Sequence, residues 1–410
     1  MRPWLVLGAV ALAAAGLGAV GGSAEPGGGS TEQDPPYTAG TAPSVDALFT
    51  ETSALRELPV RRPVASRALS RGEIEQKILQ AFKDQTTRDE VRASELALKT
   101  LGLVPPELDL MDLQLKLLTE QLAGLYDPKA REFYLASWVN PLLQRPVIVH
   151  ELAHALQDQH FDLRRLAEWP DGDSDAQMAA HSLIEGDATL LMAHYVLKHP
   201  DAGAAYMQAM LTAPKMPVFE NAPRAVRDSL TFPFVQGMQF AAALHGRGGW
   251  KSVTAAYTPL PQSTEQILHL EKFDRRERPV TVTLADVAGV LGRGWRRLDS
   301  DVSGEAGYQI ILDQFLKDPA ESHRAAAGWG GDRFSVYERA GEAVVIQMTA
   351  WDSDADAREF ADAYEKRTAL RYPQGRPAGV IIERRELRVL IVEGLPAALN
   401  PAALTRALWR

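Results

Sequence analysis

The sequence contains no cysteine among its 410 residues, so a disulfide bond and a lipid-modified cysteine are both excluded. A chain of this length can rely on its hydrophobic core for stability instead. Beyond the N-terminal segment, no stretch approaches the ~18 continuous apolar residues of a membrane-spanning helix. Basic residues are also few: 44 Lys and Arg against 53 Asp and Glu give a net charge of −9, which argues against a nucleic-acid-binding protein.

The N-terminus carries a targeting pattern. Arg2 precedes an apolar run from Trp4 to Val20, and small residues ending at Ala24 follow that run. This order is typical of a secretory signal peptide over residues 1–24, which predicts export to the periplasm or the cell exterior. The alternative is an uncleaved N-terminal anchor, because about 17 apolar residues could just span a membrane. The high content of Gly and Ala favours the signal peptide.

Composition divides the rest of the chain into three parts. Residues 25–64 contain glycine and proline clusters, and we expect a flexible Pro/Gly-rich linker there, with structure beginning near Ser70. Residues 65–275 are expected to form one domain and residues 276–410 a second. Charge and proline at Arg275–Pro279 indicate the boundary between them.

The spacing of apolar residues predicts an α+β fold, mostly helical in the first domain and smaller and mixed in the second. In the first domain we expect helices through Ile74 and Val91, a helix over Leu110–Leu122, and a β-hairpin with its turn at Asp127–Lys129. In the second we expect strands at 281–284, 343–350, 380–383 and 388–392, a tight turn at 329–333, and helices over 305–316 and from a cap at Asp352 or Asp354 through Tyr364.

The most informative motif is His150-Glu151-Leu152-Ala153-His154. On a helix, positions i and i+4 lie on one face, so both imidazoles can reach a single zinc ion, and Glu151 can polarise a water on that ion. Apolar neighbours and a proline predict a core helix from Pro146 to His160. The alternatives are a chance match and a solvated surface pair of histidines.

A hydrolytic zinc site needs a third protein ligand, and Glu185 is the best candidate. It lies in the middle of an apolar helix that we expect to begin with a capping box of Ser174 and Gln177 and to end near Lys198. An unpaired carboxylate would be costly there. Two alternatives stay open: Glu185 could pair with an arginine, and His181, one turn earlier, could be a rival ligand or lie near the substrate.

These segments together resemble the gluzincin class of zinc metallopeptidases. The sequence Glu185-Gly186-Asp187-Ala188 is similar to the E-G-x-A pattern of the bacterial peptidase MA-like group, and Phe234–Phe240 with the glycine turn at Gly248–Trp250 resembles the helix that follows in that group. The resemblance implies a zincin-like catalytic domain in which His150, His154 and Glu185 hold Zn2+ and Glu151 is the general base.

The chain departs from the thermolysin-like pattern at one position. An aspartate four residues after the ligand glutamate would orient a ligand histidine, but Thr189 stands here. Asp187 and Asp158 are the remaining candidates for that task, although an exposed acid is the simpler interpretation of Asp158. Gly186 is unfavourable within a helix, which predicts a close approach by a neighbouring helix.

Other roles are not decided by spacing. The resemblance implies that a strand before the motif helix can pair with an extended substrate, although a purely structural hairpin is an equal alternative. The sequence does not identify the residue that donates a hydrogen bond to the transition state; the candidates are Tyr126, His181, His194, Tyr195, His245, Tyr257 and His269. A site role for Glu265 also stays open. For His269, an interaction with a helix C-terminus is the favoured reading.

The sequence thus predicts an exported zinc-dependent metallohydrolase, a peptidase acting on a peptide or protein substrate. Neither nucleic acid nor stable membrane insertion is expected, apart from an uncleaved N-terminal anchor. The alternative is a catalytically inactive pseudo-peptidase that serves as an extracytoplasmic binding or assembly module. The intact Glu151 favours the enzyme, because a zinc scaffold alone does not need that carboxylate.

Overall fold

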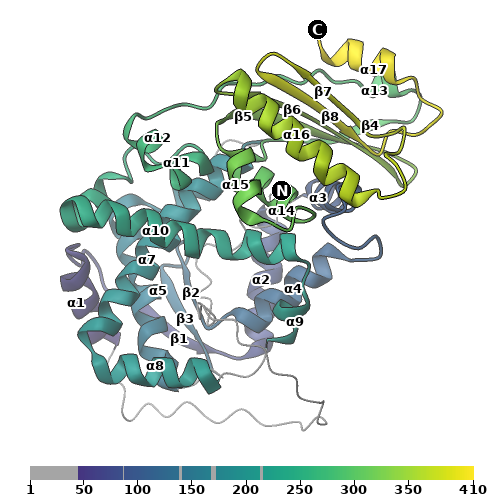
Figure 1. The fold of residues 1–410 in the computed structure, drawn as a ribbon. Helices are drawn as coiled ribbons and strands as arrows, with labels where there is room; N and C mark the ends of the chain where they lie inside the picture. Colours follow the sequence, from purple (N-terminus) through teal and green to yellow (C-terminus); the bar gives the residue numbers. More distant parts are fainter. Residues whose placement is uncertain (1–44, 86, 138–140, 168–171, 213–215) are drawn as a thin grey trace.

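The computed structural model describes residues 45–85, 87–137, 141–167, 172–212 and 216–410 (Figure 1). The expected signal peptide and residues 25–44 of the expected linker lie outside this part of the chain. Within it, no helix combines the length and the apolar character that crossing a membrane requires. The expected α+β fold is confirmed: a helical region with a small sheet is followed by a smaller region built on a second sheet (Figure 1).

The described chain begins with a helix that the composition did not predict. Helix α1 (Val45–Arg56) lies within the range expected to be a flexible linker, and that expectation is wrong for these residues. Leu48 and Phe49 are buried in the core, and α1 packs against α5 and α7. Strand β1 (Ala65–Leu69) also precedes Ser70, where structure was expected to begin. Short polar stretches around α1 hid the few apolar positions that anchor it.

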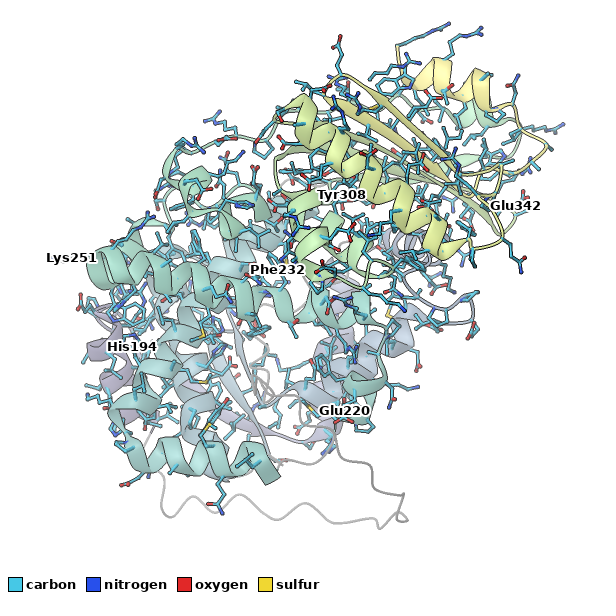
Figure 2. All side chains as sticks on the ribbon, in the orientation of Figure 1. His194, Glu220, Phe232, Lys251, Tyr308 and Glu342 are labelled. Carbon is cyan, nitrogen blue, oxygen red and sulfur yellow. The ribbon has the colours of Figure 1, made fainter. Side chains whose placement is uncertain are left out.

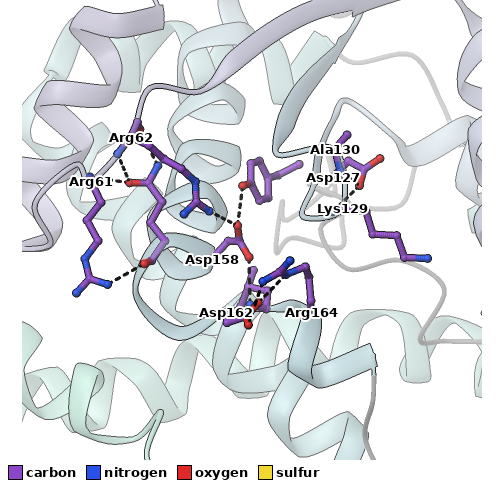
Figure 3. A network of polar contacts seen from close by, with 11 residues as sticks. Arg61, Arg62, Asp127, Lys129, Ala130, Asp158, Asp162 and Arg164 are labelled. Atoms are coloured by element: carbon purple, nitrogen blue, oxygen red, sulfur yellow. Dashed lines mark hydrogen bonds and ion pairs between the residues drawn. The ribbon is translucent and has the colours of Figure 1, made fainter.

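A three-stranded sheet lies beside the motif helix in the order β1-β3-β2. Strand β2 (Gly124–Asp127) is antiparallel to β3 (Glu132–Ala136), which confirms the predicted hairpin. Asp127 fixes the turn, because its Oδ1 atom accepts hydrogen bonds from the backbone N–H groups of Lys129 and Ala130 at 2.9 and 3.0 Å (Figure 3). β2 is the strand that contacts α5 most closely, and it lies at an edge of the sheet.

Three long helices form the centre of the helical region: α5 (Pro141–Phe161), α7 (Ser174–Lys198) and α10 (Arg224–Ala255). Helix α5 begins at Pro141, so the expected start at Pro146 is wrong. Helix α7 is capped by Asp173, which accepts a hydrogen bond from Ala176 N–H, and not by Ser174. The side chain of Ser174 is instead bonded to Asp301.

Close packing joins α7 to α10. A Cβ atom on Gly186 would lie 2.1 Å from the carbonyl of Gly237, and one on Gly237 would lie 2.0 Å from the carbonyl oxygen of Ser182. Only glycine lets the two backbones meet in this way, which confirms the expected close approach at Gly186. The expected glycine turn is also present: Gly248 and Gly249 have non-helical backbone angles and interrupt α10.

Shorter helices surround this centre and link it to the second region. Helix α4 (Leu110–Gln121) matches its prediction. The others are α2 (Arg71–Gln85), α3 (Arg88–Thr100), α6 (Arg164–Ala167), α8 (Pro200–Thr212), α9 (Pro217–Asn221), α11 (Thr264–Leu268) and α12 (Leu270–Asp274).

The C-terminal region is built on a five-stranded antiparallel sheet in the order β4-β5-β6-β8-β7. Successive residues of β8 alternate between its two faces: Val389 and Ile391 join the core beneath α16, and Leu390 and Val392 join the core beneath α17. The strands are β4 (Arg296–Asp301), β5 (Trp329–Arg339), β6 (Glu342–Trp351), β7 (Ile381–Arg385) and β8 (Arg388–Glu393), and the helices are α13 (Ala288–Leu291), α14 (Gly304–Asp313), α15 (Pro319–Ala326), α16 (Asp354–Arg371) and α17 (Pro401–Leu408).

Most of the predicted elements of this region are present, with three corrections. The segment 281–284 is not a strand, and residues 329–333 begin β5 and do not form a tight turn. Helix α16 is capped by Ser353, which accepts a hydrogen bond from Asp356 N–H; neither Asp352 nor Asp354 is the cap.

The expected division at residue 275 does not separate the two regions in space. Helix α3, from the first expected domain, packs against β4, β5 and β6 (Figure 1). Its Leu96 and Ala97 share a core with Trp351 and Phe360 of the C-terminal region. The chain therefore crosses to the second sheet early and returns to build the helical region.

Candidate metal centre

Helices α5 and α7 bring three potential metal ligands together. The Nε2 atoms of His150 and His154 lie 3.1 Å apart, and Oε2 of Glu185 lies 3.2 Å from the first and 3.6 Å from the second. All three side chains are buried, with at most 2% of their surface exposed. Two imidazole nitrogens and a carboxylate oxygen facing one point are a donor set that suits zinc.

Gln157 fixes the protonation pattern of His154. Its amide nitrogen donates hydrogen bonds to the carbonyl of Ile184 at 3.0 Å and to Asp187 at 3.1 Å, so its amide oxygen must be the atom facing His154 Nδ1 at 2.8 Å. An amide oxygen only accepts, and His154 Nδ1 therefore carries the hydrogen. In the neutral form of His154, the form that binds a metal, the lone pair is therefore on Nε2, the atom that faces the other two candidate ligands.

Asp187 supports this arrangement from behind. Its carboxylate accepts two hydrogen bonds from Arg56, at 2.6 and 3.0 Å, one from the hydroxyl of Tyr257 at 2.8 Å, and the bond from Gln157. The chain from Asp187 through Gln157 to His154 is an indirect form of the outer support that metal-binding histidines usually have. Of the two aspartates considered from the sequence, Asp187 therefore supports a ligand.

Asp158 has a different task. Its Oδ2 atom accepts hydrogen bonds from Tyr126 at 3.0 Å and from Arg62 at 2.6 Å (Figure 3). These contacts tie α5 to the small sheet and to the segment after α1. Thr189, at the position of the thermolysin-like aspartate, is buried, and its hydroxyl has no hydrogen-bond partner among the described residues.

Glu151 lies on the side of α5 that faces the edge strand. It is fully buried, and a Cβ atom on Gly124 would lie 2.9 Å from its Cγ atom. Because Gly124 has no side chain, the first residue of β2 can lie directly against Glu151. The carboxylate that follows the first ligand is thus held between the ligand pair and the strand edge.

The charges of the three ligands are coupled. Burial opposes ionisation of Glu185, but His154 and His150 outweigh it and lower the pKa of the carboxyl group. Burial likewise opposes protonation of His154, but Glu185 outweighs it and raises the pKa of His154 to about 9. Burial lowers the pKa of His150. Without metal, the site therefore holds an ionised carboxylate and one protonated imidazole.

His181 is the nearest of the candidate transition-state donors. Its Nε2 atom lies 3.9 Å from Oε1 of Glu185, and burial lowers its pKa. Tyr126 and Tyr257 are engaged by Asp158 and Asp187, as described above. Phe234 of α10 stacks on the ring of His150, with 6.4 Å between the centroids.

The remaining histidines and tyrosines lie elsewhere. His194 lies on the helical region away from the second sheet (Figure 2). Its ring contacts His245, with 4.8 Å between the imidazole centroids, and both rings contact Trp250. Tyr195 lies against His199, with 4.5 Å between the ring centroids and 37° between the ring planes. None of these rings is among the groups that meet at the ligand set.

A second carboxylate cluster is structural. Glu265, Glu277 and Asp352 surround the ammonium of Lys272, whose Nζ atom lies 3.0 Å from Glu265 and 2.5 Å from Glu277. The lysine supplies the positive charge that a metal would otherwise supply. His269 bonds to Glu305 at 2.9 Å, which joins α12 to α14. Neither His269 nor Glu265 reaches the ligand set, so both belong to the contact between the two regions.

Arg56 and Gln157 belong to the hydrogen-bond network around the candidate ligands, and the sequence analysis did not single them out. Gln157 had a usable signal, since it follows His154 by three residues and so shares its helix face. Arg56 had none, because 131 positions separate it from its partner Asp187.

Comparison with known proteins covers only the C-terminal region. Residues 293–403 match the model of a family described as a domain of unknown function (DUF8575). The matched segment contains the five-stranded sheet, and it begins well after Glu185, the last of the three candidate ligands in the sequence. No curated protein matches the chain, and no solved structure matches it.

Proposed function

We propose that this protein is an exported zinc metallohydrolase that cleaves peptide bonds. The observation that carries the proposal is the meeting of His150, His154 and Glu185 at one buried point, with Gln157 leaving the Nε2 lone pair of His154 available. When bound, zinc would act as a Lewis acid and lower the pKa of a coordinated water toward ~7. The export part rests on the N-terminal targeting pattern alone.

Glu151 is the proposed general base. It adjoins the first candidate ligand and packs on the side-chain face of β2, the edge strand of the small sheet, to whose free edge an extended peptide could add. The carboxylate would accept a proton from the attacking water and deliver it to the leaving amine. His181 is the proposed donor to the developing oxyanion, because it adjoins Glu185 and its lowered pKa keeps it neutral with an N–H to donate.

The test compares wild-type protein with Glu151→Gln, both loaded with zinc, on a mixed peptide library read by mass spectrometry. We expect Glu151→Gln to keep its zinc and to lose hydrolysis by about 10²–10⁴-fold, the usual contribution of a general acid–base residue. Glu75→Gln, at an exposed position on α2, is the control and should cleave like the wild type.

Equal cleavage by wild type and Glu151→Gln would contradict the assigned role of Glu151. Zinc-loaded wild type that cleaves nothing would favour the alternative, a binding or assembly module that retains the metal.

A further inference from the structure

We propose that Arg56, in the N-terminal strap (residues 45–62), is a positioning residue that sets zinc affinity through Asp187 and Gln157. This inference rests on the proposed zinc site. It assigns to one residue of the segment before the small sheet a role in holding a candidate metal ligand.

The strap is attached along the ligand-bearing helix. Helix α1 packs against α5 and α7, and the residues after it lie against the end of α5. The backbone N–H groups of Arg61 and Arg62 donate hydrogen bonds to Oε1 of Gln159 at 2.7 and 3.1 Å, and Gln159 donates one to the carbonyl of Arg62 (Figure 3). The ion pair between Arg62 and Asp158 adds a further contact. These bonds fix where α1 lies relative to α5.

Arg56, the last residue of α1, has a buried side chain, of which 1% is exposed. Its guanidinium donates two hydrogen bonds to Asp187 and one to the hydroxyl of Thr254 at 3.1 Å, and it lies over the ring of Trp250 at 4.7 Å from the centroid. A buried arginine is stable only when its charge and its donors are satisfied, as they are here. The planar, two-bond contact also fixes the direction of the Asp187 carboxylate.

The direction of the Asp187 carboxylate bears on the candidate ligand. Oδ2 of Asp187 and the carbonyl of Ile184 accept the two hydrogen bonds that keep the amide nitrogen of Gln157 turned away from His154. The amide oxygen of Gln157 is thereby held against His154 Nδ1. Without Arg56, Asp187 would lose two of its four donors and its fixed orientation. Gln157 would then be held by the Ile184 carbonyl alone, and His154 would be held less firmly with Nε2 on the metal side.

A purely structural ion pair is the competing explanation, and the two differ in what they predict for the metal. If Arg56 acts on His154, its replacement changes zinc affinity and the geometry of the bound ion. If it only stabilises the fold, variants that remain folded bind zinc like the wild type.

The experiment measures zinc dissociation constants of the full chain by competition with a chromophoric chelator, together with the visible absorption bands of the Co2+-substituted protein. The variants are Arg56→Met and Arg56→Lys, each also made in an Asp187→Asn background. Arg62→Ala is the matched control, because it removes a strap contact without touching Asp187. Circular dichroism identifies the variants that fold.

We expect Arg56→Met to weaken zinc binding by about 10–100-fold and to alter the Co2+ bands, as loss of an outer partner of a metal ligand does. Arg56→Lys keeps the charge but not the planar fork, and should weaken binding by about tenfold. Arg62→Ala should bind like the wild type. In the Asp187→Asn background, neither Arg56 substitution should weaken binding further.

Wild-type zinc affinity and Co2+ bands in a folded Arg56→Met would overturn this inference and leave the proposed function standing. If Arg56→Met does not fold, wild-type affinity in Arg56→Lys would overturn it equally. An equal loss in Arg62→Ala and the Arg56 variants would assign the effect to general loosening and would also overturn it. A wild-type protein that binds no zinc would overturn both this inference and the proposed function.

Discussion

Glu185 of the helical region and Glu393 of the C-terminal region are both completely buried, but different groups surround the two carboxylates. Glu393 on β8 accepts hydrogen bonds from the guanidinium groups of Arg367 and Arg371 and from the hydroxyl of Tyr364. Glu185 on α7 faces the imidazoles of three histidines. Both residues have no exposed surface, so burial alone does not distinguish them.

The difference lies in the partners. Guanidinium groups are permanently charged and leave a carboxylate with no capacity to bind a metal, so Glu393 closes the contact between α16 and the second sheet. Imidazoles can give up their proton and become ligands themselves, so Glu185 and its neighbours can bind a cation together. Asp187, two residues after Glu185, resembles Glu393, because its carboxylate is bound by the guanidinium group of Arg56. A carboxylate neutralised by arginine therefore lies directly behind one that can bind a cation.

The largest effect on stability should follow from substitution of Glu393. Glu393→Gln removes the charge that compensates Arg367, which is itself fully buried, and should lower the free energy of unfolding by about 3–5 kcal/mol. Zinc affinity should not change. Denaturant unfolding and chelator competition measure the two quantities. Glu342→Gln, whose ion pair with Arg339 is half-exposed, is the control and should cost at most about 1 kcal/mol. A large change in zinc affinity with Glu393→Gln would contradict the separation of the two sites.

Removing the hydrogen bond that orients His154 should change zinc affinity more than the free energy of unfolding. Gln157→Leu removes the acceptor of His154 Nδ1–H and should weaken zinc binding by about 10–100-fold. Chelator competition checks this value. Gln114→Leu is a matched control, because Gln114 is also buried and its amide has no hydrogen-bond partner among the described residues. Equal zinc affinities in the two variants would show that Gln157 does not orient the ligand.

The close contact between α7 and α10 fixes the position of the helix that carries Glu185, and it can be tested by adding one methyl group at Gly186. Gly186→Ala would put a Cβ atom 2.1 Å from the carbonyl of Gly237, and the overpacking should cost about 1–3 kcal/mol of stability. Gly246→Ala, at an open position on α10, should instead be neutral or stabilising by up to about 1 kcal/mol. Thermal or denaturant unfolding of both variants checks the prediction, which fails if they are equally stable.

The pH dependence of zinc binding sharpens the contrast further. His154, with a pKa raised to about 9, keeps a proton at neutral pH that zinc must displace. The apparent zinc affinity should therefore rise about tenfold per pH unit between pH 7 and 9 and level off above that range. Calorimetry in buffers of different ionisation enthalpy would detect the released proton. An affinity that does not change over this range would contradict the assigned protonation state.

The same pKa has a consequence for the metal-free protein. A histidine whose pKa is higher in the folded state than its usual 6.5 stabilises the fold fully below pH 6.5. That contribution is lost as the pH rises toward 9. The metal-free protein should thus lose stability over this interval, and zinc should remove most of the dependence.

The ligands were predictable because their chemistry is local. His150 and His154 are one helical turn apart, and any helix places them on the same face. Glu185 was indicated by a charge within an apolar helix, and Gly186 by its low helix propensity. Each of these signals lies within a few residues of the feature that it predicts.

Contacts between residues that are distant in sequence could not be predicted. Arg56 meets Asp187 across 131 positions, and nothing near Arg56 distinguishes it from a surface arginine. Helix α3 joins the second sheet although its neighbours in sequence belong to the first region.

The misread start of β5 has a similar cause. Gly330 and Gly331 looked like a turn, but glycine is needed at position 331 because the backbone of Val280 lies against it; a Cβ atom on Gly331 would be 2.2 Å from the Val280 carbonyl oxygen. A close approach between distant segments and a local turn both favour glycine, and the sequence alone does not separate them.

The most direct test of the zinc site is the metal content of the purified full chain, compared between wild type and Glu185→Ala. The metal is removed with a chelator, zinc is added back, and the bound zinc is measured by inductively coupled plasma mass spectrometry. We predict about one zinc per wild-type chain, and little or none in the variant, because the ligand set would lose its only carboxylate. A wild-type protein that holds no zinc after reloading, or a variant that holds as much as the wild type, would contradict the proposed metal centre.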